Sequence, residues 1–381
     1  MVIKNGFVFI GGGFVKTDIE VKGRLIGGLG EMSGGDGILD CGGLKVIPGL
    51  VDVHTHGRMG HSFNSARGGC LELLLKDYAM CGVTTVLATV MTDSPETMED
   101  ACAALRDVIE AGEYGCRGIN LEGPFLSERK KGAHHAGYLK NPSIEFFDKL
   151  HRASGEHINI ISMAPELEGA LEMTGRLRKY RFHSECGDSG VRVSLGHSAC
   201  DYETAATAFD AGADHVTHAF NAMEGITARN PGIIPAALDK RAYIELICDG
   251  YHVAPSLLRM IVKAAPDRTV LISDSITPAG MPDGSYESGG QTVTKQGDRI
   301  TGGDGVIAGS AISLLEGLRR CITQFGIDEA TAVTAATFNP ASAAGLEKSV
   351  GSIAVGMSAD MVAVNDAYEA VHVVAGGKLL Y

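Results

Sequence analysis

Eight short apolar segments recur through the middle of this 381-residue chain, and they constrain its fold more than any other feature. Each is rich in β-branched residues and has the length of a strand, and helical patterns lie between them. Their apolar character is continuous rather than alternating, which indicates strands buried on both faces, as in a parallel sheet covered by helices. The segments read KVIPGLVDVH, GVTTVLATV, CRGINLE, INIISMAP, VRVSLGH, DHVTH, AYIELICD and TVLISD.

The segments between these strands carry helical spacing and capping residues. Apolar residues in 71–80 recur at i, i+3, i+4 and i+7. Ser94 and Gly112 are expected to bound a second helix, and Asp201 and Gly212 a third. Eight strand-then-helix units predict a TIM barrel. The alternative is a doubly wound open sheet, which is disfavoured because no GxGxxG or GxxxxGK[ST] phosphate loop opens a helix.

The two ends of the chain have a different texture, in which short apolar runs alternate with glycine. Residues 1–47 and 351–381 predict a small β-sandwich built from both termini, with the barrel occupying 48–350. A glycine-rich stretch between Ile276 and Ser310 predicts a hairpin inserted after the eighth strand. Loops at that end of a barrel usually line the active site.

Charge and cysteine usage narrow the class of protein. The net charge of -13 argues against nucleic acid or anionic membranes as partners. It also means that an anionic substrate needs local positive groups. The nine cysteines include no CxxC pair, which favours buried free thiols in a reducing cytoplasm. The N-terminal sequence lacks a signal-peptide pattern, and no apolar run is long enough to span a membrane.

Metal-ligating residue types stand where the predicted strands end. In a parallel barrel all strand carboxyl ends meet at one face, so residues far apart in sequence converge there. An HxH pair on a strand directs both side chains to one side. Each occurrence alone is a weak signal, whereas the whole set predicts a metal centre. The set comprises His54 and His56 on the first strand, Glu122 on the third, His197 on the fifth, His218 on the sixth and Asp274 on the eighth.

Histidine and carboxylate ligands suit Zn²⁺, Fe²⁺ or Mn²⁺ rather than Ca²⁺. A catalytic metal site keeps one position open for water, whose pKa then falls to about 7. Asp274 fits the group that accepts the water proton and passes it to a leaving nitrogen.

Two segments of the sequence resemble those of the amidohydrolase superfamily. The segment IPGLVDVHTHG is similar to its first-strand signature, and GSIAVGMSADMVAVN to its closing segment. Within the superfamily the whole chain resembles the N-acetylglucosamine-6-phosphate deacetylases. The motifs that carry this resemblance are LEGPFL, KGAHH, SLGHS, THAFNAM, ARNPG, DGYHV and SDSITPAG. The resemblance implies metal-dependent hydrolysis of an acetamide on a phosphorylated amino sugar, by a cytoplasmic homodimer with Zn²⁺ or Fe²⁺.

The resemblance also implies roles for individual residues. Glu122, His197 and His218 match the principal metal ligands, and Asp274 matches the catalytic acid and base. His134 matches the histidine that polarises the acetamide carbonyl. The sugar phosphate would be held by the segment after the sixth strand and by a cation that the neighbouring subunit typically lends. The matching substrate-binding residues are Asn221, Ala222, Arg229 and His252, with Ile307 beside the acetyl group.

Two points of the pattern bear on the metal and the substrate. His54 and His56 make a second ion plausible, bridged by Glu122. The fourth strand, INIISMAP, lacks the lysine that bridges two metals in many amidohydrolases, which counts against enzymes acting on cyclic amides. Three rivals stay open: the same chemistry on N-acetylgalactosamine 6-phosphate, a cyclic-amide hydrolase, and a non-catalytic scaffold, which would be expected to lose metal ligands.

Overall fold

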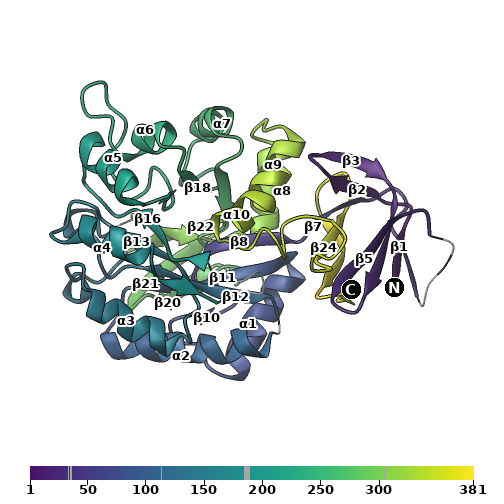
Figure 1. Ribbon diagram of the computed structural model, residues 1–381, viewed down its shortest axis with the longest axis horizontal. Helices are drawn as coiled ribbons and strands as arrows, with labels where there is room; N and C mark the ends of the chain where they lie inside the picture. The colour runs from purple at the N-terminus through teal and green to yellow at the C-terminus, as the bar shows by residue number, and fades with distance from the viewer. Residues whose placement is uncertain (33, 35–36, 113, 184–188, 304) are drawn as a thin grey trace.

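Eight parallel strands form a closed barrel in the computed structural model, which describes all residues except 33, 35–36, 113, 184–188 and 304 (Figure 1). The sheet order is β19-β18-β17-β16-β13-β12-β11-β8. The first and last strands lie side by side, since the Asp274 amide donates to the His54 carbonyl. The strands are β8 (Leu50–Thr55), β11 (Val83–Met91), β12 (Cys116–Glu122), β13 (Ile158–Met163), β16 (Arg192–Leu195), β17 (His215–Val216), β18 (Tyr243–Ile247) and β19 (Thr269–Ile272).

Helices surround this barrel, and the three predicted from spacing and caps are confirmed. The Ser94 hydroxyl caps α2 at the Thr97 amide, and Asp201 caps α5 at the Thr204 amide. Among the described residues, no helix is long and apolar enough to cross a membrane. The helices are α1 (Gly69–Met80), α2 (Pro95–Ala111), α3 (Ile144–Ala153), α4 (Ala170–Leu177), α5 (Tyr202–Ala211), α6 (Ile233–Asp239), α7 (Pro255–Ala264), α8 (Leu314–Thr323), α9 (Glu329–Ala336) and α10 (Phe338–Ala343), with 3₁₀ turns at Glu128–Lys130 and Ala136–Tyr138.

Strands from both termini form two further sheets beside the barrel, where both chain ends lie (Figure 1). Apolar side chains of both sheets share one core, with Ile3 and Ile19 on one side and Val46 and Met361 on the other. The predicted β-sandwich is therefore confirmed. One sheet is β5 (Leu25–Gly30), β4 (Asp18–Lys22), β1 (Val2–Lys4) and β6 (Ile38–Asp40); the other is β26 (Lys378–Leu379), β25 (Ala370–Ala375), β24 (Met361–Val364), β7 (Lys45–Pro48), β2 (Phe7–Ile10) and β3 (Gly13–Lys16).

The insertion after β19 differs from its prediction. It is a four-stranded antiparallel sheet rather than a single hairpin. Its strands are β20 (Gly284–Ser288), β21 (Gln291–Gln296), β22 (Arg299–Gly302) and β23 (Ile307–Ser310). The sheet buries a small core of its own around Val293 and Ile300, and a core of that kind needs more than two strands to cover it. Two short ribbons complete the fold, β9 (Gly57–Arg58) with β10 (His61–Ser62) and β14 (Arg181–Phe182) with β15 (Ser189–Gly190).

One end of the barrel interior is closed by apolar side chains, here called the floor cluster. Two asparagine amides tie the segment around α10 to the beginnings of strands: Asn339 donates to the Thr269 carbonyl, and Asn159 to the Ala344 carbonyl. The amino-terminal end of the barrel is thereby plugged, and the carboxyl-terminal end is left for a cavity. The floor cluster comprises Val51, Val53, Leu87, Ile160, Ile247, Val270, Ile272, Ala341, Ala343, Ala344, Leu346 and Val350.

Candidate active site

The carboxyl ends of the strands surround a cavity of about 420 Å³. It opens between the barrel and the inserted sheet, whose Ile307 and Gln291 form part of its wall. His54 is fully buried behind the lining. Most residues singled out from the sequence line this cavity: His56, Glu122, His134, His197, His218, Asn221, Ala222, His252, Asp274 and Ile307.

Glu122 lies at the centre of this group, with histidines around both of its carboxylate oxygens. Oε1 is 3.0 Å from His197 Nε2 and 2.9 Å from His218 Nε2. His54 Nε2 is 3.4 Å from the same oxygen. Oε2 is 3.3 Å from His56 Nε2 and 3.1 Å from His134 Nε2. A carboxylate placed in this way can offer one oxygen to each of two neighbouring cations.

The donor set on the Oε1 side fits a metal ion. The Nδ1–H of His197 donates to the Lys130 carbonyl at 2.9 Å, so Nε2 of the neutral ring carries a lone pair. That lone pair faces His218 Nε2 at 3.0 Å as well as the Glu122 oxygen. Electron-rich atoms crowded this closely need a proton or a cation between them, and Zn²⁺ with nitrogen and oxygen ligands at about 2.0–2.2 Å matches their chemistry. Glu122, His197 and His218 would hold such an ion.

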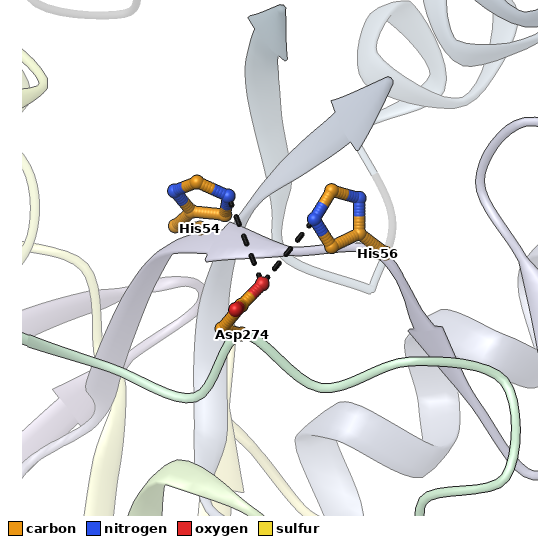
Figure 2. A group of neighbouring side chains, drawn as sticks. All are labelled: His54, His56 and Asp274. Atoms are coloured by element: carbon orange, nitrogen blue, oxygen red, sulfur yellow. Dashed lines mark ion pairs between the residues drawn. The ribbon is translucent and has the colours of Figure 1, made fainter. Parts of the chain in front are cut away.

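A second group of donors lies at the end of β8 and just after β19: His54 is on the strand and His56 directly follows it, and both imidazoles face the Asp274 carboxylate (Figure 2). Asp274 Oδ1 is 3.3 Å from His56 Nε2 and 3.8 Å from His54 Nε2. His54 Nε2 is buried, and no described residue offers it a hydrogen-bond partner. Since a buried polar atom without a partner is costly, this nitrogen also fits the ligand of a cation.

Burial and mutual charge shift the pKa values of these groups. Burial lowers the pKa of His197 to about 4, which keeps the ring neutral, as a ligand must be. Burial also lowers the pKa of His56, but hydrogen bonds with Asp274 and Glu122 outweigh it and raise the value to about 9. The carboxyl of Glu122 has its pKa lowered, because the charges of His134 and His54 outweigh its burial. A cation bound at His56 would therefore displace the proton that the raised pKa of this ring retains.

Three of the candidate metal-binding residues have backbone conformations that side chains other than glycine rarely adopt. The φ angles of His197, His218 and Asp274 are 47°, 25° and 48°, in the left-handed region. Each follows the end of its strand by two residues. Such conformations cost about 1–3 kcal/mol each and persist only where the surroundings enforce them. These conformations lower the stability of the fold, and they direct the three side chains into the cavity.

The remaining predicted substrate residues divide into two groups. Asn221, Ala222, Ile307 and His252 line the cavity, as does His134 from the loop after β12. His252 Nδ1 is 2.7 Å from Asp249 Oδ2. Burial lowers the pKa of His252, but the hydrogen bond with Asp249 outweighs it and raises the value. Arg229, in contrast, is exposed in the loop after β17 and does not line the cavity of its own chain.

Two contributors to the site carry no motif and went unnoticed in the sequence. Glu245 lies in the middle of β18, fully buried, with its Oε2 2.9 Å from His54 Nδ1. An acid in the middle of the apolar run AYIELIC was the available signal. Gln291 of the inserted sheet donates its side-chain amide to the Ala133 carbonyl at 2.7 Å, next to His134. No pattern in the glycine-rich insertion indicated that contact.

Residues 45–380 match the Amidohydrolase family, which covers most of the chain. The barrel and its mouth, here meaning the histidine-rich carboxyl-terminal end that surrounds the cavity, agree with this match. The chain therefore belongs to the amidohydrolase family. The fold and function class expected from the sequence are thereby confirmed.

Within this family the chain is similar to deacetylases of phosphorylated amino sugars. It is 33% identical over 337 residues to N-acetylgalactosamine-6-phosphate deacetylase of Escherichia coli O157:H7, covering 88% of this chain and 87% of the relative. It is 31% identical to N-acetylglucosamine-6-phosphate deacetylase of Bacillus subtilis, covering 100% and 94%. A solved structure of a mutant N-acetyl-D-glucosamine-6-phosphate deacetylase from Mycobacterium smegmatis, in complex with N-acetyl-D-glucosamine-6-phosphate, superposes with a TM-score of 0.92 at 29% identity, covering 100% and 98%.

Proposed function

We propose that this chain hydrolyses N-acetyl-D-glucosamine 6-phosphate to D-glucosamine 6-phosphate and acetate. The observation that carries the proposal is the convergence of Glu122, His197 and His218 within about 3 Å of one another, at a cavity that Asp274 also faces. This arrangement provides a metal site and a proton-transfer group side by side. The similarity to deacetylases over nearly the whole chain supports the substrate class.

The chain's own residues would perform the proton transfers. A divalent ion held by Glu122, His197 and His218 supplies a Lewis acid that makes water acidic. The Asp274 carboxylate accepts the proton of the attacking water and then delivers it to the departing amine nitrogen. Burial raises the pKa of Asp274, but hydrogen bonding with His56 and the charges around it outweigh that and lower it, so the group starts as a base. His134 donates a hydrogen bond to the acetamide oxygen, where negative charge develops.

The phosphate needs a cation that the cavity of one chain does not supply. The described residues that line it include no lysine or arginine, and His252 joins His56 as a lining group whose raised pKa favours a positive charge there. We propose that the enzyme is a homodimer in which Arg229, exposed on its loop, reaches the cavity of the partner subunit. Asn221 and Ala222 would hold the same phosphate from the segment after β17. Ile307 would wall the acetyl group.

N-acetyl-D-galactosamine 6-phosphate is the second candidate substrate. The specific observation in its favour is the relative from Escherichia coli O157:H7, which is named for that sugar and is 33% identical to this chain. The two sugars differ only in the configuration of one hydroxyl, and the reaction steps above serve both.

The deciding experiment is a deacetylation assay on both phosphorylated epimers and on unphosphorylated N-acetylglucosamine, with protein reconstituted in Zn²⁺ or Fe²⁺. The gluco epimer should give the highest kcat/KM, and the unphosphorylated sugar the lowest. A higher kcat/KM on the galacto epimer would reassign the substrate. Absence of acetate release from all three sugars would refute the proposal.

The number of metal ions and the cellular compartment belong to the same proposal. We propose two ions per chain under metal-replete conditions, the second held by His54, His56 and Asp274 with Glu122 between them. Donor atoms of His54, His56 and Asp274 within 4.8 Å of one another support the second position, and the distances of about 3 Å among Glu122, His197 and His218 support the first. We place the enzyme in the cytoplasm, because the eight cysteines of the described residues are all free thiols. Cys186 lies outside the described residues.

A further inference from the structure

The seventh barrel strand contributes a buried carboxylate that the mechanism above does not use. Glu245 lies on β18, and its side chain is fully buried. Removing a carboxylate from water costs several kcal/mol unless charged or polar partners compensate. A buried acid in an otherwise apolar strand therefore needs a reason that packing alone does not supply.

Two nitrogen atoms compensate this charge, and both belong to the predicted metal ligands. Glu245 Oε2 is 2.9 Å from His54 Nδ1 and accepts a hydrogen bond from the His218 backbone amide at 3.1 Å. One carboxylate oxygen thus ties β18 to β8 and to the segment after β17. The other, Oε1, has no hydrogen-bond partner among the described residues.

The contact with His54 determines which ring nitrogen faces the cavity centre. An ionised carboxylate can only accept, so His54 Nδ1 must carry the hydrogen. In the neutral ring, Nε2 then holds the lone pair, and it points toward the Glu122 and Asp274 oxygens at 3.4 Å and 3.8 Å. Metal-ligating histidines commonly donate their other N–H to a carboxylate in this way, which fixes the tautomer and raises the basicity of the ligand.

We infer that Glu245 is a positioning residue that holds His54 as the Nδ1–H tautomer and so presents its Nε2 lone pair to a divalent metal ion. The inference rests on the metal centre of the proposed function. It adds a third buried strand residue to that centre, after His54 on β8 and Glu122 on β12, and this residue never touches the substrate. Replacing Glu245 should therefore lower the affinity for the metal ion more than it lowers the rate of the reaction at the fully loaded site.

The test is metal retention by Glu245→Gln. The amide keeps the size of the side chain but removes the charge that favours the Nδ1–H form. Purified holoenzyme loaded with Zn²⁺ would be dialysed against a series of chelator concentrations and analysed for zinc per chain. The affinity of the more weakly held zinc should fall by about 10–100-fold, the usual cost of losing such a partner. With Co²⁺ in place of zinc, the visible absorption bands should shift as well, because the ligand field at His54 changes.

Asp214→Asn provides a matched control. Asp214 Oδ1 is 2.6 Å from Nδ1 of the fully buried His215, the same kind of pairing, but neither residue lines the cavity. This control should leave zinc retention and the cobalt spectrum as in the wild type. A loss of zinc in the control equal to that in Glu245→Gln would mean that general destabilisation, not His54, controls retention, and would overturn the inference.

A double variant separates action through His54 from action elsewhere. In a His54→Asn background, adding Glu245→Gln should lower zinc affinity no further, because the residue through which Glu245 acts is gone. A further loss, or unchanged retention in the single Glu245→Gln variant, contradicts the inference. If Glu245→Gln does not fold, Glu245→Asp, which keeps the charge but draws it back from His54 Nδ1, takes its place in both comparisons, with the same outcomes expected. Acetate release by the wild type is measured separately, so failure of the proposed substrate would be distinguished from failure of this inference.

Discussion

The two ends of one barrel are built for opposite purposes. At the amino-terminal end, the floor cluster is made of valine, isoleucine, leucine and alanine side chains, and a segment around α10 closes it. At the carboxyl-terminal end, five histidines surround the carboxylate of Glu122, and three of the candidate metal-binding residues have left-handed backbone angles. The same strands therefore provide stability at one end and chemistry at the other.

The contrast is sharpest along β19. Ile272, the last residue of the strand, belongs to the floor cluster and is fully buried. Asp274 stands two residues further on, with φ at 48° and its carboxylate on the cavity. An apolar contact and a strained, charged group are thus separated by a single residue. This separation predicts that substitutions at the mouth change the reaction and that substitutions at the floor change stability.

The largest effect is expected from Asp274→Asn. An amide cannot accept the water proton, so kcat should fall by at least about 10²-fold, the usual scale for general acid–base catalysis. Steady-state kinetics on N-acetylglucosamine 6-phosphate, with metal content measured in parallel, checks this. A variant that keeps its zinc and retains near-wild-type kcat would remove Asp274 from the mechanism.

The next effect concerns the number of ions at the mouth. His54→Asn combined with His56→Asn removes two donors of the proposed second site and leaves Glu122, His197 and His218 untouched. After anaerobic loading with excess metal, elemental analysis should give one ion per chain in the double variant, against up to two in the wild type. The double variant should keep some activity. A wild type that never exceeds one ion, held by the untouched three residues, would defeat the second site and leave the deacetylase proposal standing.

Arg229→Ala tests whether the mouth is completed by a second subunit. A charge-assisted hydrogen bond to phosphate contributes about 1.5–3 kcal/mol, or roughly 10–150-fold in kcat/KM. The variant should therefore lose activity on the phosphorylated sugar while activity on unphosphorylated N-acetylglucosamine stays the same. Mixing Arg229→Ala with Asp274→Asn protein should restore part of the activity if the arginine acts across a dimer. Undiminished discrimination between the two sugars in Arg229→Ala would show that this arginine does not bind the phosphate.

A smaller, pH-dependent effect is expected from Asp249→Asn. Asp249 raises the pKa of His252, so the ring stays cationic to a higher pH and loses its charge as the pH rises through that value. Without the carboxylate the pKa of His252 falls, and KM for the phosphorylated sugar should begin to rise at a lower pH than in the wild type. The control is KM for the unphosphorylated sugar, which should not follow His252. Superimposable KM profiles for wild type and variant would contradict a role for the His252 charge.

The sequence predicted the strands of the barrel and most residues of its mouth, but not every residue that contributes there. Continuous apolar runs predicted the eight strands, because burial on both faces leaves an unambiguous pattern. The convergence of the candidate ligands at the cavity followed from strand ends alone, since every parallel strand points the same way. Glu245 was missed because one acid in an apolar run carries no motif, although its contact with His54 ties two strands together. Arg229 lies outside the cavity of its own chain, and the expectation that it serves a neighbouring subunit came from the resemblance, because spacing and apolar pattern describe one chain only.

The smallest effect should come from Ile272→Val, and it tests the comparison most directly. The change removes one methylene group from the floor cluster, two residues before the proposed catalytic carboxylate. Such a substitution typically costs about 0.5–1.5 kcal/mol in unfolding free energy. Urea unfolding should show that loss, while kcat stays unchanged, because the hydrogen bond from the Asp274 amide to the His54 carbonyl fixes the mouth independently of the floor. If kcat fell instead, with stability preserved, the packing of the floor would be setting the position of Asp274, and the division between the two ends would be wrong.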